Sequence, residues 1–129
     1  MSTFTESTSR IVVAAQPSPL EKESNLSESV YVFAYTITIT NNSSETVQLL
    51  ERHWVIESAG EQVGEVTGQG VVGVQPVLEP GEAFEYTSST VIRDPIGSME
   101  GSYVFRNPSG GAFVVPIPKF SLVFPTMFH

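Results

Sequence analysis

The segment from Tyr31 to Thr40, YVFAYTITIT, constrains the fold more than any other part of this chain. Alternate positions along it are large and apolar: Tyr31, Phe33, Tyr35, Ile37 and Ile39. The positions between them hold valine, alanine or threonine. A period of two, built from aromatic and β-branched residues, predicts a β-strand with one buried face.

Shorter strand-like segments separated by turn signals continue along the chain. The predicted strands cover residues 10–17, 46–58, 61–66, 83–92, 102–107, 112–118 and 119–125. Pro80-Gly81 and the PSGG segment at 108–111 are turn signals, and nine prolines with ten glycines leave little room for long helices. The pattern predicts an all-β fold, an antiparallel β-sandwich of the immunoglobulin or fibronectin III type. A small β-barrel is the alternative.

The chain of 129 residues is the right length for one domain. We expect residues 1–9, which are rich in serine and threonine, to form a disordered tail, and residues 10–129 to form the domain. Pro17 is expected to end the first strand, and the polar segment 18–29 is expected to be an exposed loop.

The segment TGQGVVGVQP, residues 67–76, contains the spacing of a dinucleotide-binding loop at Gly68, Gly70 and Gly73. In such a site a helix follows the glycines, and its N-terminal N–H groups bind the pyrophosphate. Here Pro76 and Pro80 follow closely and disfavour that helix. We call residues 67–76 the glycine loop. We favour a conformational role for its glycines, with a small anion-binding loop as the alternative.

Arg52 and Trp54 are the notable residues of segment 46–58. Alternation places both on the face of Leu50 and Ile56, which should point into the core. Trp54 is expected to be a central core residue. For Arg52 two interpretations stay open: its stem packs on apolar neighbours with the charge at the sheet edge, or it binds an anion near the glycine loop, a role Arg93 could share.

Few residues could support catalysis or metal binding. The chain has no cysteine, and His53 is the only histidine besides the C-terminal His129. A serine nucleophile would need His53 as its base and Asp94, the only aspartate, so we predict no catalytic residues. Glu51 and His53 share one strand face and are weak candidates for a divalent-metal site, although a solvated polar face is the favoured interpretation.

Net charge disfavours one class of partner. Fourteen acidic residues against six basic ones give −8, and no basic run is present, so nucleic-acid binding is not expected. The longest apolar run near the N-terminus is Ile11–Ala15, too short for a signal peptide or membrane span. With the absence of cysteine, this favours a cytoplasmic protein. The apolar C-terminal residues FPTMFH could dock on the protein's own core, on a partner, or on a second copy in a homodimer.

Five motifs in order make the chain resemble the ApaG family of small bacterial proteins. They are RHWVIES, GQGVVGVQP, LEPGEAFEYTSS, PIGSMEGSY and IPKFSL, and the resemblance spans Arg10 to His129. It implies a fibronectin III-like sandwich, no defined enzymatic activity, no cofactor, and a genetic association with cobalt resistance and magnesium efflux. Because the domain binds other proteins in eukaryotic relatives, the resemblance also implies a protein partner.

Two positions depart from the family pattern. Ser88-Ser89-Thr90 stands where members usually have Ser-Gly, and Val74 stands where a polar or charged residue is common. We therefore expect a protein-interaction module, with weak phosphate, pyrophosphate or nucleotide binding at the glycine loop and a divalent-metal sensor as alternatives. Gly68, Gly70, Gly73, Arg52 and Trp54 are its candidate binding residues.

Overall fold

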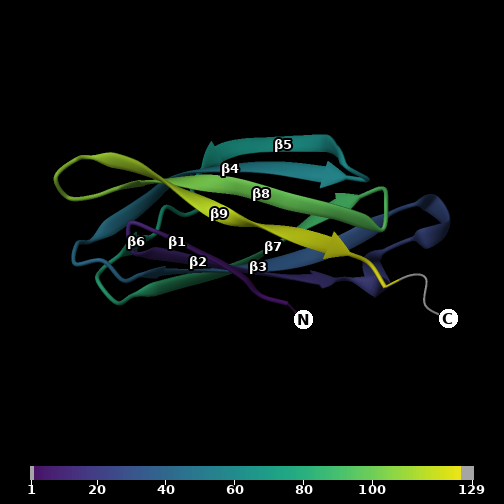
Figure 1. The fold of residues 1–129 in the computed structure, drawn as a ribbon, viewed down its shortest axis with the longest axis horizontal. Helices are drawn as coiled ribbons and strands as arrows, with labels where there is room; N and C mark the ends of the chain where they lie inside the picture. The colour runs from purple at the N-terminus through teal and green to yellow at the C-terminus, as the bar shows by residue number, and fades with distance from the viewer. Residues whose placement is uncertain (1, 126–129) are drawn as a thin grey trace.

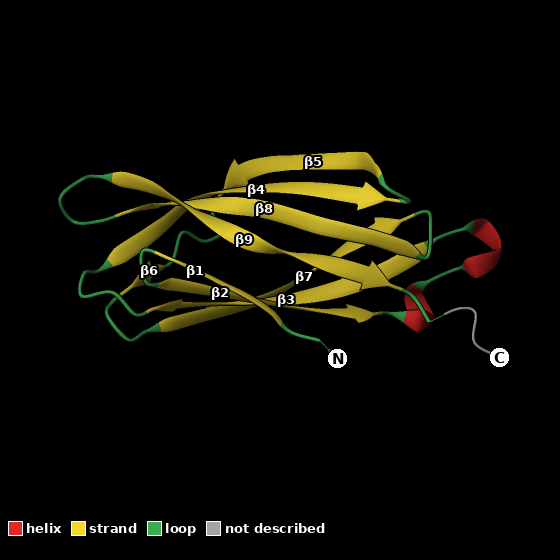
Figure 2. Ribbon diagram, in the orientation of Figure 1, coloured by secondary structure: helices red, strands yellow, loops and turns green. Residues whose placement is uncertain are grey.

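The computed structural model describes residues 2–125 and is a sandwich of two antiparallel sheets (Figures 1 and 2). The elements in chain order are β1 (Phe4–Thr8), β2 (Ile11–Pro19), η1 (Glu21–Glu23), η2 (Leu26–Glu28), β3 (Tyr31–Asn41), β4 (Val47–Ser58), β5 (Glu61–Gln69), β6 (Val77–Leu78), β7 (Ala83–Ile92), β8 (Ile96–Arg106) and β9 (Ala112–Val123). One sheet has the order β1-β2-β3-β7, and the other has the order β5-β4-β8-β9 with β6 paired to β4. The predicted sandwich is confirmed, because the two sheets do not join into a barrel.

Strand β3 has the burial that its sequence period predicted. Phe33, Tyr35, Ile37 and Ile39 are buried between the sheets, whereas the threonines between them are only partly covered. The outward threonines pair across the sheet with β7, where Thr36 and Thr87 share a hydrogen bond of 2.9 Å. The apolar face of β3 therefore sets which side of this sheet meets the other sheet.

Strand β4 differs from the predicted alternation in its first part. Leu49 is fully buried and Leu50 is only partly covered, although Leu50 was expected on the core face. The register between β4 and β8 shifts between Leu49 and Glu51, which is a β-bulge at Leu50. One extra residue reverses the alternation, so Leu49 lies on the same side as Arg52 and Trp54.

Strand β2 continues past Pro17 and ends at Pro19, so the expectation that Pro17 ends this strand is wrong. The Asn42 N–H donates to the Arg10 carbonyl, and the β2–β3 register runs unbroken from there. Backbone groups of antiparallel strands alternate toward and away from the partner, which turns Pro17 and Pro19 away from β3. Strand β1 pairs β2 only as far as Ala15, so neither proline removes a needed donor.

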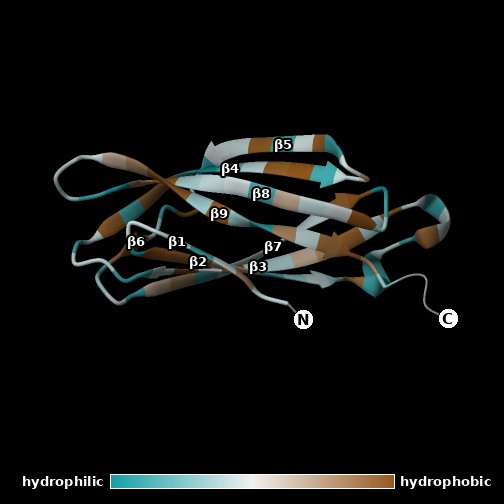
Figure 3. Ribbon diagram, in the orientation of Figure 1, coloured by the Kyte–Doolittle hydropathy of each residue, from teal (hydrophilic) through white to brown (hydrophobic). Residues whose placement is uncertain are grey.

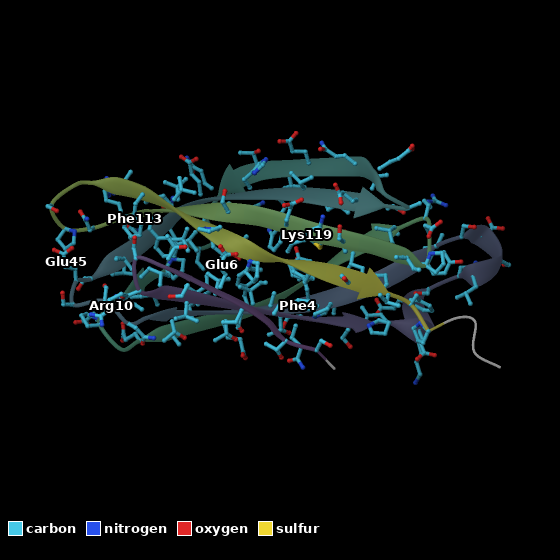
Figure 4. All side chains as sticks on the ribbon, in the orientation of Figure 1. Phe4, Glu6, Arg10, Glu45, Phe113 and Lys119 are labelled. Carbon is cyan, nitrogen blue, oxygen red and sulfur yellow. The ribbon has the colours of Figure 1, made fainter. Side chains whose placement is uncertain are left out.

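The expected disordered tail, residues 1–9, is also corrected, because Phe4–Thr8 form an edge strand. A tight turn joins β1 to β2 with positive φ at both Ser9 and Arg10, which hairpin sequences usually signal with glycine or asparagine. Phe4, labelled in Figure 4, lies 6.2 Å from Phe120 of β9 between ring centroids. Packing of this side chain orders a segment whose polar composition suggested disorder.

The remaining expectations concern the loop and the C-terminus. In segment 18–29, Ser18 and Pro19 still belong to β2, and the rest contains the short 3-10 turns η1 and η2 with no buried residue in either, close to the predicted exposed loop. Phe124 packs 5.3 Å from Tyr31 and 5.7 Å from Phe33, so it docks on the protein's own core. The rest of the expected docking tail, residues 126–129, lies outside the described residues. In the part of the chain that is described, no helix has the length and apolarity of a membrane span.

Candidate functional site

The glycine loop connects β5 to β6, and each glycine has its own structural role. Gly70 and Gly73 have positive φ of 65° and 84°. Val71 and Val74 exchange backbone hydrogen bonds of 2.8 and 2.9 Å around Val72-Gly73, both at positive φ, which is a tight I′-like hairpin. A side chain at Gly70 would place its Cβ 2.2 Å from the Val74 carbonyl oxygen.

Gly68 is needed because Arg52 lies directly over it. A Cβ at this position would approach the Arg52 guanidinium to between 2.8 and 2.9 Å. Arg52 Nη1 donates to the carbonyls of Gln69 and Gly70, both at 3.0 Å. The glycine loop and Arg52 thus form one unit, in which the loop supplies acceptors and Gly68 supplies space.

The loop does not have the parts of a dinucleotide site. It leads into strand β6, and the helical turns among residues 2–125 are η1 and η2, both far earlier in the chain. The Gly70 N–H donates to the Leu50 carbonyl at 2.7 Å, and the Val71 and Val74 N–H groups serve the hairpin. These amides are therefore engaged with the protein's own carbonyls, which does not favour the anion-binding alternative.

Trp54 is a core residue that also borders a cavity. It is 3% exposed, and its ring centroid lies 5.3 Å from Tyr35 and 6.0 Å from Phe120. A cavity of about 210 Å³ begins beside it, between β7 and the β4–β5 pair. Its lining residues are Tyr35, Arg52, Trp54, Ile56, Val66, Ser88, Ser89, Thr90 and Met99. We call the side of the sandwich between the edge strands β5 and β7 the open side.

Arg52 dominates the electrostatics of this cavity, because it is the only charged residue among those lining it. The salt bridges between described residues involve His53 and Lys119 and leave Arg52 without a carboxylate. Ser88, Ser89 and Thr90 of β7 line the same cavity. The site combines one half-buried cation with hydroxyl groups and apolar walls.

Two tyrosines join the sheets next to this cation. The hydroxyls of Tyr86 on β7 and Tyr103 on β8 are 2.5 Å apart and buried. Burial raises the pKa of Tyr86 well above its ordinary range, and the hydrogen bond from Tyr103 and the Arg52 charge oppose this rise. Burial likewise raises the pKa of Tyr103. Both phenols stay neutral, so neither supplies a negative partner for Arg52.

The weak metal candidates lie on the opposite face of β4. His53 Nε2 is 2.6 Å from Glu65 Oε2, and the two side chains are 38% and 55% exposed. Glu51 is exposed and takes no part in this pair. Within residues 2–125, no group of three or more His, Asp or Glu side chains is placed to hold a metal ion.

The other catalytic and anion candidates are separated from this pair and from Arg52. Asp94 accepts a hydrogen bond from the Ile96 N–H, and Arg93 donates to the Glu28 carbonyl, each within the loops around β7 and η2. The structure therefore joins Gly68, Gly70, Arg52 and Trp54, and separates His53 and Arg93 from them. Sequence analysis missed the hydroxyls of Ser88 and Thr90, whose only signal was their departure from the family pattern.

Comparison with known proteins identifies the family. The profile of the ApaG domain matches residues 21–107 of this chain. A protein named ApaG from Chromobacterium violaceum is 47% identical over 91% of this chain and 93% of its own length. The chain belongs to the ApaG family.

Other relatives agree with this assignment. An ApaG protein from Ralstonia nicotianae is 50% identical over 85% of this chain and 89% of its own length. A crystal structure of a Bordetella pertussis protein described as ApaA superposes with a TM-score of 0.87 at 42% identity, covering 98% of this chain and 100% of that one. The resemblance that the five sequence motifs suggested is confirmed, and the names of these relatives specify no substrate.

Proposed function

We propose that this ApaG-family chain is a non-enzymatic protein-interaction module of the cytoplasm, and that its open side contacts the partner. The observation that carries the proposal is the pair of unpaired edge strands, β5 and β7, flanking one cavity. Edge strands offer free backbone donors and acceptors to another protein.

Exposed valines support a protein partner. Five of them lie on β5, the glycine loop and β7, each more than two fifths exposed: Val63, Val66, Val72, Val74 and Val91. Figure 3 shows hydrophobic segments on β5 although it is the edge of its sheet. Apolar side chains beside free backbone edges fit recognition by apolar contact and strand pairing.

A non-enzymatic role agrees with the placement of the titratable groups. His53, the histidine among the described residues, pairs with Glu65 on the outer face of the β4–β5 pair, away from the cavity. The cavity itself contains hydroxyls and a cation without a base beside them. For the cellular setting we adopt the association with cobalt resistance and magnesium efflux, acting through a partner protein and not through a bound ion.

A pull-down from bacterial lysate with two matched variants tests the proposal. Val66 lies on the open side and Val114 lies on β9, and both are exposed, at 41% and 59%. We expect Val66→Glu to lose a specifically retained protein that the wild type and Val114→Glu both keep. Circular dichroism must show the same fold for both variants. If the two variants retain the same proteins, or the wild type retains none, the proposal is wrong.

A further inference from the structure

We infer that the edge of β7 pairs with an extended segment of the partner protein, and that one acidic side chain of this segment binds Arg52 in the cavity. This inference rests on the proposed function and specifies the chemistry of the partner. It also explains why the half-buried Arg52 pairs with no carboxylate among residues 2–125.

Strand β7 offers a regular free edge. The Asn41 N–H donates to the Glu82 carbonyl at 2.9 Å, and the β3–β7 register then runs without a shift to Tyr31 and Ile92. Alternation from this bond directs the backbone N–H and C=O groups of Thr87 and Ser89 away from β3. These groups form the hydrogen-bonding pattern that an added strand requires.

The other edge of the same sheet consists of the short strand β1 and of the part of β2 beyond it, and that part of β2 is protected. Beyond the end of β1, strand β2 presents Pro17 and Pro19 at its outer edge, and proline cannot donate to an added strand. The sequence of β7, AFEYTSSTVI, contains no proline and one charged residue. Long edges without such protection invite pairing with another chain.

The cavity lies where alternate side chains of a strand added to β7 would point. It is lined by Ser88, Ser89 and Thr90 of β7 on one side and by Val66 of β5 on the other. An added strand would continue the sheet toward β5 and cover this opening, with every second side chain directed inward. A carboxylate at one inward position would meet Arg52.

Arg52 has donors to spare for a carboxylate. Its hydrogen bonds to described residues both start from Nη1, whereas a guanidinium has five N–H donors. Among residues 2–125 there is no buried side-chain nitrogen or oxygen without a partner, so the remaining Arg52 donors are open to the cavity. A fork of N–H donors suits a carboxylate, and the two carbonyl contacts hold the guanidinium in place.

The charge of the chain limits the acidity of the partner segment. The net charge of −8 would repel a polyacidic peptide, while Arg52 attracts a single carboxylate at short range. Exposed Val66 lines the cavity and favours an apolar residue next to the acidic one. The expected segment is therefore an apolar strand with one glutamate or aspartate.

The test uses the full chain and two capped synthetic peptides of alternating threonine and valine, one with a central glutamate and one with a central glutamine. Titration followed by backbone NMR should shift the amides of residues 85–91. We expect the glutamate peptide to bind about tenfold more tightly than the glutamine peptide. The Arg52→Gln variant should bind both equally. If Arg52→Gln does not fold, the comparison of the two peptides on the wild-type protein still tests the inference.

Matched proline variants identify the edge. The Gly70 N–H donates to the Leu50 carbonyl, and alternation along β5 from this bond directs the Thr67 N–H away from β4. The Ser89 N–H points away from β3 in the same way. Neither proline removes a native sheet hydrogen bond. We expect Ser89→Pro to abolish binding of both peptides and Thr67→Pro to preserve it.

Five results would overturn the inference. Equal affinity for the two peptides would show that Arg52 does not bind a carboxylate of the partner. The proposed role as an interaction module would not be affected by this result. Loss of binding in Thr67→Pro but not in Ser89→Pro would show that the peptide pairs with β5 and not with β7. Displacement of the glutamate peptide by inorganic phosphate but not by acetate makes the site a phosphate site. If neither peptide binds, β7 does not pair with an extended peptide. If sedimentation shows that the chain forms a dimer through β7, a second copy occupies this edge in place of a partner segment.

Discussion

The two lateral sides of the sandwich use different chemistry for the same task, which is to end a sheet in water. On one side, β1 covers part of β2 and packs Phe4 against Phe120 of β9, with Pro17 and Pro19 where β1 stops. On the open side, β7 and β5 leave a cavity that holds Arg52. On the first side β1 and two prolines cover or block the edge of β2, whereas on the second side the edge of β7 has no such protection.

This difference supports the open side as the side of the sandwich that a partner protein would contact. A domain that only had to avoid association would protect both edges. Here the protection is confined to the side of β2, while the open side keeps a regular strand, exposed valines and an uncompensated cation. Aromatic packing on the first side contributes to stability, and the second side is the one that we propose for partner binding.

The largest effect that sharpens this comparison is expected from Phe120→Ala. Phe120 is buried and contacts Phe4, Tyr35 and Trp54, so its removal leaves a cavity in the core. The free energy of unfolding should fall by about 3–5 kcal/mol. Val66→Ala on the open side, where the side chain is 41% exposed, should cost below about 1 kcal/mol. Urea denaturation measures both, and similar losses would remove the contrast between the sides.

The sequence predicted the core side of the molecule better than the open side. The period of β3 was sufficient to assign Phe33, Tyr35, Ile37 and Ile39 to the interior, because burial of a whole face leaves a regular pattern. The bulge at Leu50 and the hairpin at Ser9-Arg10 were not predictable, since neither carries a glycine or asparagine signal. Local patterns reveal regular structure and miss the irregularities that place Arg52 and β1.

The candidate site was predicted only in part for a similar reason. The sequence indicated that Arg52 points inward and that the glycines have a conformational role, because both follow from local properties. That Gly68 faces Arg52, and that Ser88 and Thr90 line the same cavity, depends on pairing between β4 and β5 and on stacking of the two sheets. These relations are long-range and leave no local pattern.

The second prediction concerns the tyrosine pair that joins the sheets at the open side. Burial keeps Tyr86 and Tyr103 protonated in the folded protein, while in the unfolded chain both ionise near the ordinary value of 10.0. The unfolded state therefore binds fewer protons above that pH, and stability is lost as pH rises. The slope should reach about 1.4 kcal/mol per pH unit for each tyrosine.

Denaturation at a series of alkaline pH values measures this slope, and Tyr86→Phe provides the control. The variant should show a shallower decline because only Tyr103 remains to titrate, whatever its stability at neutral pH. An unchanged slope in Tyr86→Phe would mean that other groups cause the alkaline loss and that the pair is not shielded from water.

A third prediction separates the roles of Gly68 and Arg52. In Gly68→Ala the new Cβ would displace the guanidinium from the Gln69 and Gly70 carbonyls, at a cost of about 1–3 kcal/mol. In an Arg52→Ala background the same substitution should cost little, because nothing then occupies the space over residue 68. A double-mutant cycle measures the coupling. Additive effects would show that Gly68 is required for the strand itself and not for Arg52.

The smallest effect is expected one residue along β4, on the opposite face. His53 and Glu65 are 2.6 Å apart, but both side chains are accessible to solvent, so water competes with their interaction. Glu65→Gln should therefore change the free energy of unfolding by less than about 1 kcal/mol at neutral pH, as measured by urea denaturation. It should also leave the peptide affinity at the open side unchanged, since the pair lies outside the cavity. Because Arg52 and His53 are adjacent in sequence, a loss of binding in this variant would show that the two faces of β4 are coupled, and the assignment of binding to the inner face alone would fail.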